Sequence, residues 1–132
     1  MADNRVLIDT SIIIDFLRKT NKKKSVLWEI REKNQCFISS ITLFELRCGV
    51  KTEKHSDDIE KLCKWIFTIP FDNEIAEVSS IIYQNLKENK QLIEFRDIFI
   101  AATAIANNLC IATLNTKHFE RISDIFLLNT QK

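Results

Sequence analysis

The pattern of apolar and polar positions near the amino terminus predicts a strand followed directly by a helix. Residues 6–8 form a short, β-branched apolar run, which is typical of a central parallel strand buried on both faces. Asp9 and two hydroxyl residues follow it, and a helix is predicted over residues 11–18. Chemistry in open α/β sheets lies just beyond the carboxyl ends of the strands, where Asp9 would stand. Capping of the helix by one of these polar residues is the alternative.

Short apolar strands and amphipathic helices alternate along the rest of the chain, with no repeat and no linker. Further strands are predicted over residues 36–38, 67–69 and 110–112, with a last edge strand over residues 125–128. Further helices are predicted over residues 26–32, 42–50, 74–87 and 92–108, with another ending near residue 65. This order predicts one domain over residues 1–132, a three-layer α/β/α sandwich with a mainly parallel central sheet.

The helix around Asp97 carries the most informative pattern. Residues 98–106 are almost wholly apolar or alanine, so this helix must be buried nearly all round. Asp97 shares a face with Ala101 and Ala104, where small residues would pack closely against the sheet. A carboxylate there is costly unless it is paired or bound to a cation. A first-turn Asp is also favoured by the helix dipole, but burial of this face favours the ligand interpretation.

Three carboxylates fall at equivalent places in the predicted sheet. Asp9 follows the first strand, Glu45 opens the helix after the second, and Asp97 opens the helix before the fourth. In a parallel sheet these positions can face the same edge. For Glu45 there is a structural alternative, a capping box with Thr42 at the start of its helix.

Carboxylates that converge without Lys or Arg between them repel one another, so such a cluster needs a cation. Oxygen ligands suit Mg²⁺ or Mn²⁺, and such a site activates water and stabilises the leaving oxygen of a phosphodiester. Ser11 and Asn115 would lie beside the acids. The residues therefore predict metal-dependent phosphodiester hydrolysis.

Composition narrows the classes of function. The 132 residues are 45% hydrophobic and 28% charged, which suits one domain with a core. The net charge of +1 argues neither for nor against nucleic acid, and a single glycine excludes a Gly-rich phosphate loop. The four cysteines form no C-x-x-C pair, so we expect reduced core thiols in a cytoplasmic protein. No apolar run is long enough for a membrane span.

Four segments in order resemble the PIN domain, and more narrowly the VapC-type toxins of bacterial and archaeal toxin–antitoxin pairs. They are VLIDTSIIIDFL, ISSITLFEL, RDIFIAATAIANN and TLNTKHFERI, and the match runs from Val6 to about Ile125. The resemblance implies a homodimeric endoribonuclease that uses Mg²⁺ or Mn²⁺ on cellular RNA. It also implies a VapB-like antitoxin, expected to cover apolar surface between the early helices and to place a basic residue among the acids.

The resemblance assigns roles residue by residue. Asp9, Glu45 and Asp97 match the three core acids; Asp9 and Asp97 would bind the metal, and Glu45 would complete the site. Ser11 matches a small hydroxyl residue that supports the metal site.

The stretch after the fourth strand departs from the family pattern. Asn115 and His118 stand where acids are common, so the number of metal ions, one or two, is left open. His118 has three possible roles: a Mn²⁺ ligand, a phosphate contact or a surface side chain. Glu94, one turn before Asp97, would either add an acid to the site, face solvent or pair with Arg96.

Two other classes of function compete with the nuclease. The missing fourth acid motivates a PIN-fold module that binds RNA or a partner with weak or lost catalysis. A receiver or a haloacid-dehalogenase-like phosphatase also uses an Asp at a strand end. The phosphatase needs a second Asp where Ser11 stands, and the receiver needs an acid pair that this chain lacks.

Overall fold

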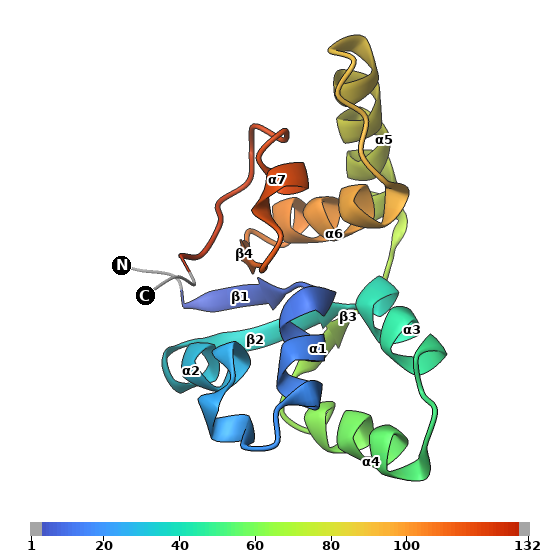
Figure 1. Cartoon of the computed structure of the whole chain (residues 1–132). Coiled ribbons are helices and arrows are strands. Elements are labelled where there is room, and N and C mark those ends of the chain that lie inside the picture. Colours follow the sequence, from blue (N-terminus) through green and yellow to red (C-terminus); the bar gives the residue numbers. More distant parts are fainter. Residues whose placement is uncertain (1–3, 130–132) are drawn as a thin grey trace.

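A four-stranded parallel sheet forms the centre of the protein. The structure is a computed structural model that describes residues 4–129, and its strand order is β3-β2-β1-β4 (Figure 1). Leu7 in β1 pairs with Phe37 on one side and Ile111 on the other. Every strand pair in the described chain is parallel, which confirms the expected sheet. The strands are β1 (Arg5–Ile8), β2 (Gln35–Ser39), β3 (Phe67–Ile69) and β4 (Cys110–Ala112).

Helices cover both faces of this sheet and complete the expected three layers. They are α1 (Thr10–Arg18), the 3₁₀ turn η1 (Lys22–Lys24), α2 (Val26–Lys33), α3 (Ser40–Cys48), α4 (Glu53–Leu62), α5 (Asn73–Glu88), α6 (Phe95–Ala106) and α7 (Thr116–Phe119). In Figure 1, α1, α2 and α4 lie on one side of the sheet, and α5, α6 and α7 on the other. The sheet therefore has a hydrophobic core on each face. Because strand side chains alternate between faces, Val6 and Ile8 pack in the core beneath α1 and α2, and Leu7 packs in the core beneath α5 and α6.

Local capping explains where α5 and α3 begin, and it corrects the predicted start of α3. Asp72 caps α5 through a 2.9 Å hydrogen bond from the Ile75 amide. Ser39, rather than Thr42, caps α3, because the Ser39 hydroxyl accepts the Thr42 amide at 3.0 Å. The helix therefore begins two residues earlier than predicted, and Thr42 is buried inside it. The capping-box interpretation of Thr42 and Glu45 is wrong.

Several other element ends also differ from the prediction. The helix predicted from residue 92 begins at Phe95, because Glu94 is its N-cap residue. The helix predicted to end near residue 65 stops at Leu62. The expected last strand is a single bridge between Ile111 and Leu127. β4 is only three residues long, so it offers little edge for a further strand.

The cysteines are free thiols, as expected, but they are not all core residues. Only Cys36 is buried, whereas Cys48 is exposed and Cys63 and Cys110 are partly buried. Burial raises the pKa of the Cys36 thiol to about 11, against an opposing effect of Arg31. Cys36 therefore stays protonated at neutral pH. Within residues 4–129, no helix has the length and apolar character needed to cross a membrane.

Candidate functional site

Asp9 lies at the carboxyl edge of the sheet, where the central strand β1 runs beside the outer strand β4. It directly follows β1, and its backbone amide donates to the Ala112 carbonyl of β4 at 2.9 Å. Although Asp9 precedes α1, its side chain makes no capping hydrogen bond to that helix. The carboxylate is instead buried, with 3% of Asp9 exposed, and faces neighbouring side chains. The helix-capping alternative therefore does not describe the Asp9 side chain.

Hydroxyl groups hold one oxygen of this buried carboxylate. Ser11 donates to Asp9 Oδ2 at 2.9 Å, and Thr113 donates to the same oxygen at 2.7 Å. Ser11 is thus placed beside Asp9, as predicted. Sequence reasoning missed Thr113, and the signal available for it was a hydroxyl residue directly after the fourth predicted strand. Thr10, also missed as a site residue, donates to Glu45 Oε1 at 2.8 Å.

Arg96 joins the three predicted acids into one cluster. Its Nε donates to Glu45 Oε2 at 2.7 Å, and one terminal nitrogen donates to Asp9 Oδ1 at 3.1 Å. Its other terminal nitrogen donates to Asp97 Oδ1. The acids therefore do converge at one edge of the sheet, but the expectation that no Lys or Arg lies between them is wrong.

The charged form of Arg96 is favoured by these contacts. Burial alone would lower the pKa of the guanidinium, but the hydrogen bond with Glu45 and the charges of Asp9 and Glu45 outweigh it. The pKa of Arg96 is therefore raised above its ordinary value. Asp97 is buried, with 4% exposed, and a buried carboxylate needs such a positive partner.

His118 also belongs to the cluster. Its Nδ1 lies 2.8 Å from Asp97 Oδ2, the carboxylate oxygen that Arg96 does not contact. Three roles were left open for His118, and this contact contradicts one of them, a side chain that merely lies on the surface. Asn115 is exposed at the start of α7, and its backbone N–H donates to Thr113 Oγ1 at 3.0 Å. Glu94 is exposed at the start of α6, as in the solvent-facing alternative.

The types of side chain at the site suit a divalent metal ion, but their present arrangement does not. The carboxylate oxygens of Asp9, Glu45 and Asp97 are hard ligands of the kind that Mg²⁺ and Mn²⁺ prefer. Yet no group of three or more His, Cys, Asp or Glu side chains among residues 4–129 is arranged to hold an ion. The Arg96 guanidinium binds the oxygens that face the centre of the cluster.

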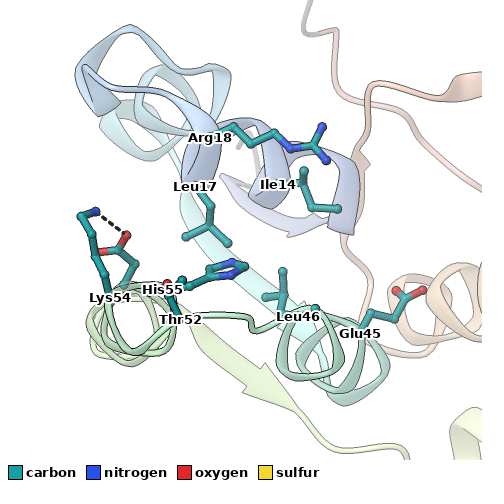
Figure 2. A pocket seen from close by; sticks show the side chains of 10 residues that line it. Ile14, Leu17, Arg18, Glu45, Leu46, Thr52, Lys54 and His55 are labelled. Carbon is teal, nitrogen blue, oxygen red and sulfur yellow. Dashed lines mark hydrogen bonds and ion pairs between the residues drawn. The ribbon is translucent and has the colours of Figure 1, made fainter.

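A partly apolar groove with a volume of about 420 Å³ opens beside the acids. Ile14 and Leu17 of α1, Leu46 of α3 and His55 of α4 line it. Figure 2 shows Leu17 and His55 on opposite walls, while Glu45 extends away from the groove. The groove thus runs between the early helices and reaches the acid cluster at Glu45.

Comparisons with known proteins agree with this fold. The PIN domain model matches residues 6–125. Ribonuclease VapC1 of Methanocaldococcus jannaschii is 34% identical over 126 residues, which cover 95% of this chain and 86% of the relative. Ribonuclease VapC of Rickettsia bellii is 36% identical, covering 93% of this chain and 94% of the relative. The DNA-bound VapBC structure from Salmonella typhimurium gives a TM-score of 0.87 at 26% identity, covering 96% and 98% of the two chains.

Proposed function

Because the chain belongs to the PIN-domain family, we propose that it is an endoribonuclease, the toxin of a VapBC-type toxin–antitoxin pair. Relatives named Ribonuclease VapC, at 34% and 36% identity over most of the chain, support this activity. The observation that carries the proposal is the convergence of Asp9, Glu45 and Asp97 at one edge of the sheet.

We further propose that Asp9 and Asp97 hold Mg²⁺ or Mn²⁺ and that Glu45 completes the site. A divalent cation held there supplies a water of lowered pKa and stabilises the leaving oxygen of a phosphodiester. The protein's own residues orient the donors. Ser11 and Thr113 hold the carboxylate of Asp9 through Oδ2. His118 contacts the carboxylate of Asp97, also through Oδ2. Such supporting contacts fix the direction in which a ligand presents its free oxygen.

The RNA contacts would come from basic side chains around this edge, since the net charge of the chain is only +1. Arg18 lines the groove beside Glu45, and Lys117 is exposed on α7 next to His118. Contacts of this kind bind phosphates and position the substrate without reading its sequence.

Removal of the divalent cation is expected to stop RNA cleavage. The purified chain, free of antitoxin, would be incubated with bulk RNA including tRNA, in Mn²⁺, in Mg²⁺ and with a chelator. We expect discrete products with a cation and none with the chelator. Cleavage that persists in chelator would contradict the metal proposal. No cleavage in any condition, together with no thermal stabilisation by Mn²⁺, would favour the binding module without catalysis.

We propose that a VapB-like antitoxin covers the groove between α1, α3 and α4. Its partly apolar lining and its position beside Glu45 suit a partner that blocks the site, and the structural neighbour from Salmonella is a VapBC complex. The homodimer and the cytoplasmic location stay predictions.

Ile14→Glu is expected to weaken antitoxin binding by about tenfold or more, because a charge would be buried against an apolar partner. The partner would be a purified VapB-like antitoxin, such as one encoded by a small reading frame adjacent to this gene, with affinity measured by titration calorimetry. Ile81→Glu is the matched control, since Ile81 is 61% exposed on α5 and does not line the groove. Equal losses in both variants, or none in Ile14→Glu, would place the partner elsewhere.

A further inference from the structure

The guanidinium of Arg96 binds a different acid with each of its three nitrogens. Nε is 2.7 Å from Glu45 Oε2, one terminal nitrogen is 3.1 Å from Asp9 Oδ1, and the other contacts Asp97 Oδ1. The nitrogen that contacts Asp9 also donates to Glu45 Oε1 at 3.0 Å. One side chain therefore binds both oxygens of Glu45 and one oxygen of each aspartate.

The outer oxygens of the two aspartates are also engaged. Asp9 Oδ2 accepts hydrogen bonds from Ser11 and Thr113, and Asp97 Oδ2 contacts His118. The oxygens that remain for a cation at the centre of the cluster are those that Arg96 binds. A divalent cation and the Arg96 guanidinium thus need the same lone pairs.

We propose that Arg96 is the internal counter-ion of this site and that it competes with the divalent cation for the carboxylates. The proposal rests on the proposed function, because it concerns the same acids. In the metal-free protein Arg96 neutralises part of their charge and holds them together. Cation binding then requires the guanidinium to leave the space between the acids.

Arg96 is the member of the cluster that can move. Its side chain is 28% exposed, whereas the side chains of Asp9 and Asp97 are 4% and 5% exposed. It lies in the first turn of α6, directly after Phe95, and its long, unbranched stem can carry the charged group into water. The two aspartates would keep their places, because Ser11 and Thr113 hold Asp9 and His118 contacts Asp97.

Competition of this kind makes cation affinity depend on how often Arg96 is displaced. If the displaced state is populated at about 10%, the apparent affinity is reduced about tenfold. Removing the guanidinium should therefore strengthen cation binding, although the acids lose their counter-ion. A side chain that merely positioned the acids for the metal would have the opposite effect.

The test is Mn²⁺ titration calorimetry on chelator-treated wild-type protein, Arg96→Gln and Arg47→Gln. Arg47 is an exposed arginine of α3 that contacts Ser56, so its variant is the matched control. We expect Arg96→Gln to bind Mn²⁺ about tenfold or more tightly than wild type, and Arg47→Gln to match wild type. We also expect Mn²⁺ to raise the melting temperature of Arg96→Gln more than that of wild type.

Equal or weaker Mn²⁺ binding by Arg96→Gln would overturn the competition, while binding by wild type would leave the proposed metal site standing. Failure of every protein to bind would overturn both proposals. A second measurement covers the case in which Arg96→Gln does not fold. In wild-type protein labelled with ¹⁵N, the Nε–H signal of Arg96 should be protected from exchange without cation and lose that protection with Mg²⁺. An unchanged signal at saturating Mg²⁺ would also overturn the proposal.

Discussion

Asp97→Asn is expected to lower the rate of RNA cleavage by more than about 100-fold while the protein stays folded. Asn has nearly the size of Asp and keeps an oxygen that can accept the hydrogen bond from Arg96. It lacks the negative charge that a hard divalent cation requires of its ligand. Loss of an outer partner of a metal ligand already costs ~10–100-fold in activity or metal affinity, so loss of a ligand's charge should cost more. The measurement is the initial rate of product formation in Mn²⁺, beside a thermal unfolding curve.

Glu94→Gln is the matched control for this experiment. Glu94 also carries a carboxylate and lies three residues before Asp97, but it is exposed at the start of α6. Its variant should cleave RNA at the wild-type rate. Normal, metal-dependent turnover by Asp97→Asn would contradict the role given to Asp97. Equal cleavage by Asp97→Asn and wild type, without metal dependence, would indicate a contaminating nuclease.

Leu7→Ala is expected to lower the free energy of unfolding by about 3 kcal/mol, within the ~2–5 kcal/mol typical of Leu-to-Ala changes in a core. Leu7 lies in the central strand β1, is 0% exposed, and belongs to the core beneath α6. The loss has two parts, the transfer energy of the deleted methyl groups and the cavity that they leave. In urea unfolding, with a slope of about 1–3 kcal/mol/M, the midpoint should fall by about 1 M or more.

Ile81→Ala is the comparison for the core variant. Ile81 is 61% exposed on α5, and surface substitutions usually change stability by within about 0.5 kcal/mol. A small loss for Leu7→Ala, equal to that of Ile81→Ala, would mean that the core between the sheet and α6 is not packed as the structure has it.

The strands could be predicted because their signal is local. The run over residues 6–8 is apolar at every position, and the structure buries all three side chains on the two faces of the sheet. Strands at residues 67–69 and 110–112 have the predicted bounds. Helix ends were less predictable, because several hydroxyl residues compete to cap α3. Ser39 caps the helix through local hydrogen bonds to Thr42, while the Thr42 hydroxyl accepts a hydrogen bond from Thr10, 32 residues away, and is buried inside the helix.

Arg96 shows why the candidate site could not be completed from sequence. Neighbouring residues of a helix do not face each other, so nothing in the sequence places Arg96 on the same side as Asp97. The guanidinium reaches Asp9 and Glu45, which are 87 and 51 residues away along the chain. His118 contacts Asp97 across 21 residues. Contacts between residues so far apart along the chain depend on how α6 and α7 pack against the sheet edge.

The sequence by itself determined the α/β class, the parallel strands and the three acids at strand and helix ends, because periodicity and position along the chain carry that information. The tertiary structure alone decided what lies between those acids. It placed a guanidinium at the centre of the cluster and the Ser11 and Thr113 hydroxyls and the His118 imidazole around it. The physical reason is that three carboxylates, two of them buried, must be compensated by a positive charge, and only the folded chain brings one within hydrogen-bonding distance of all three.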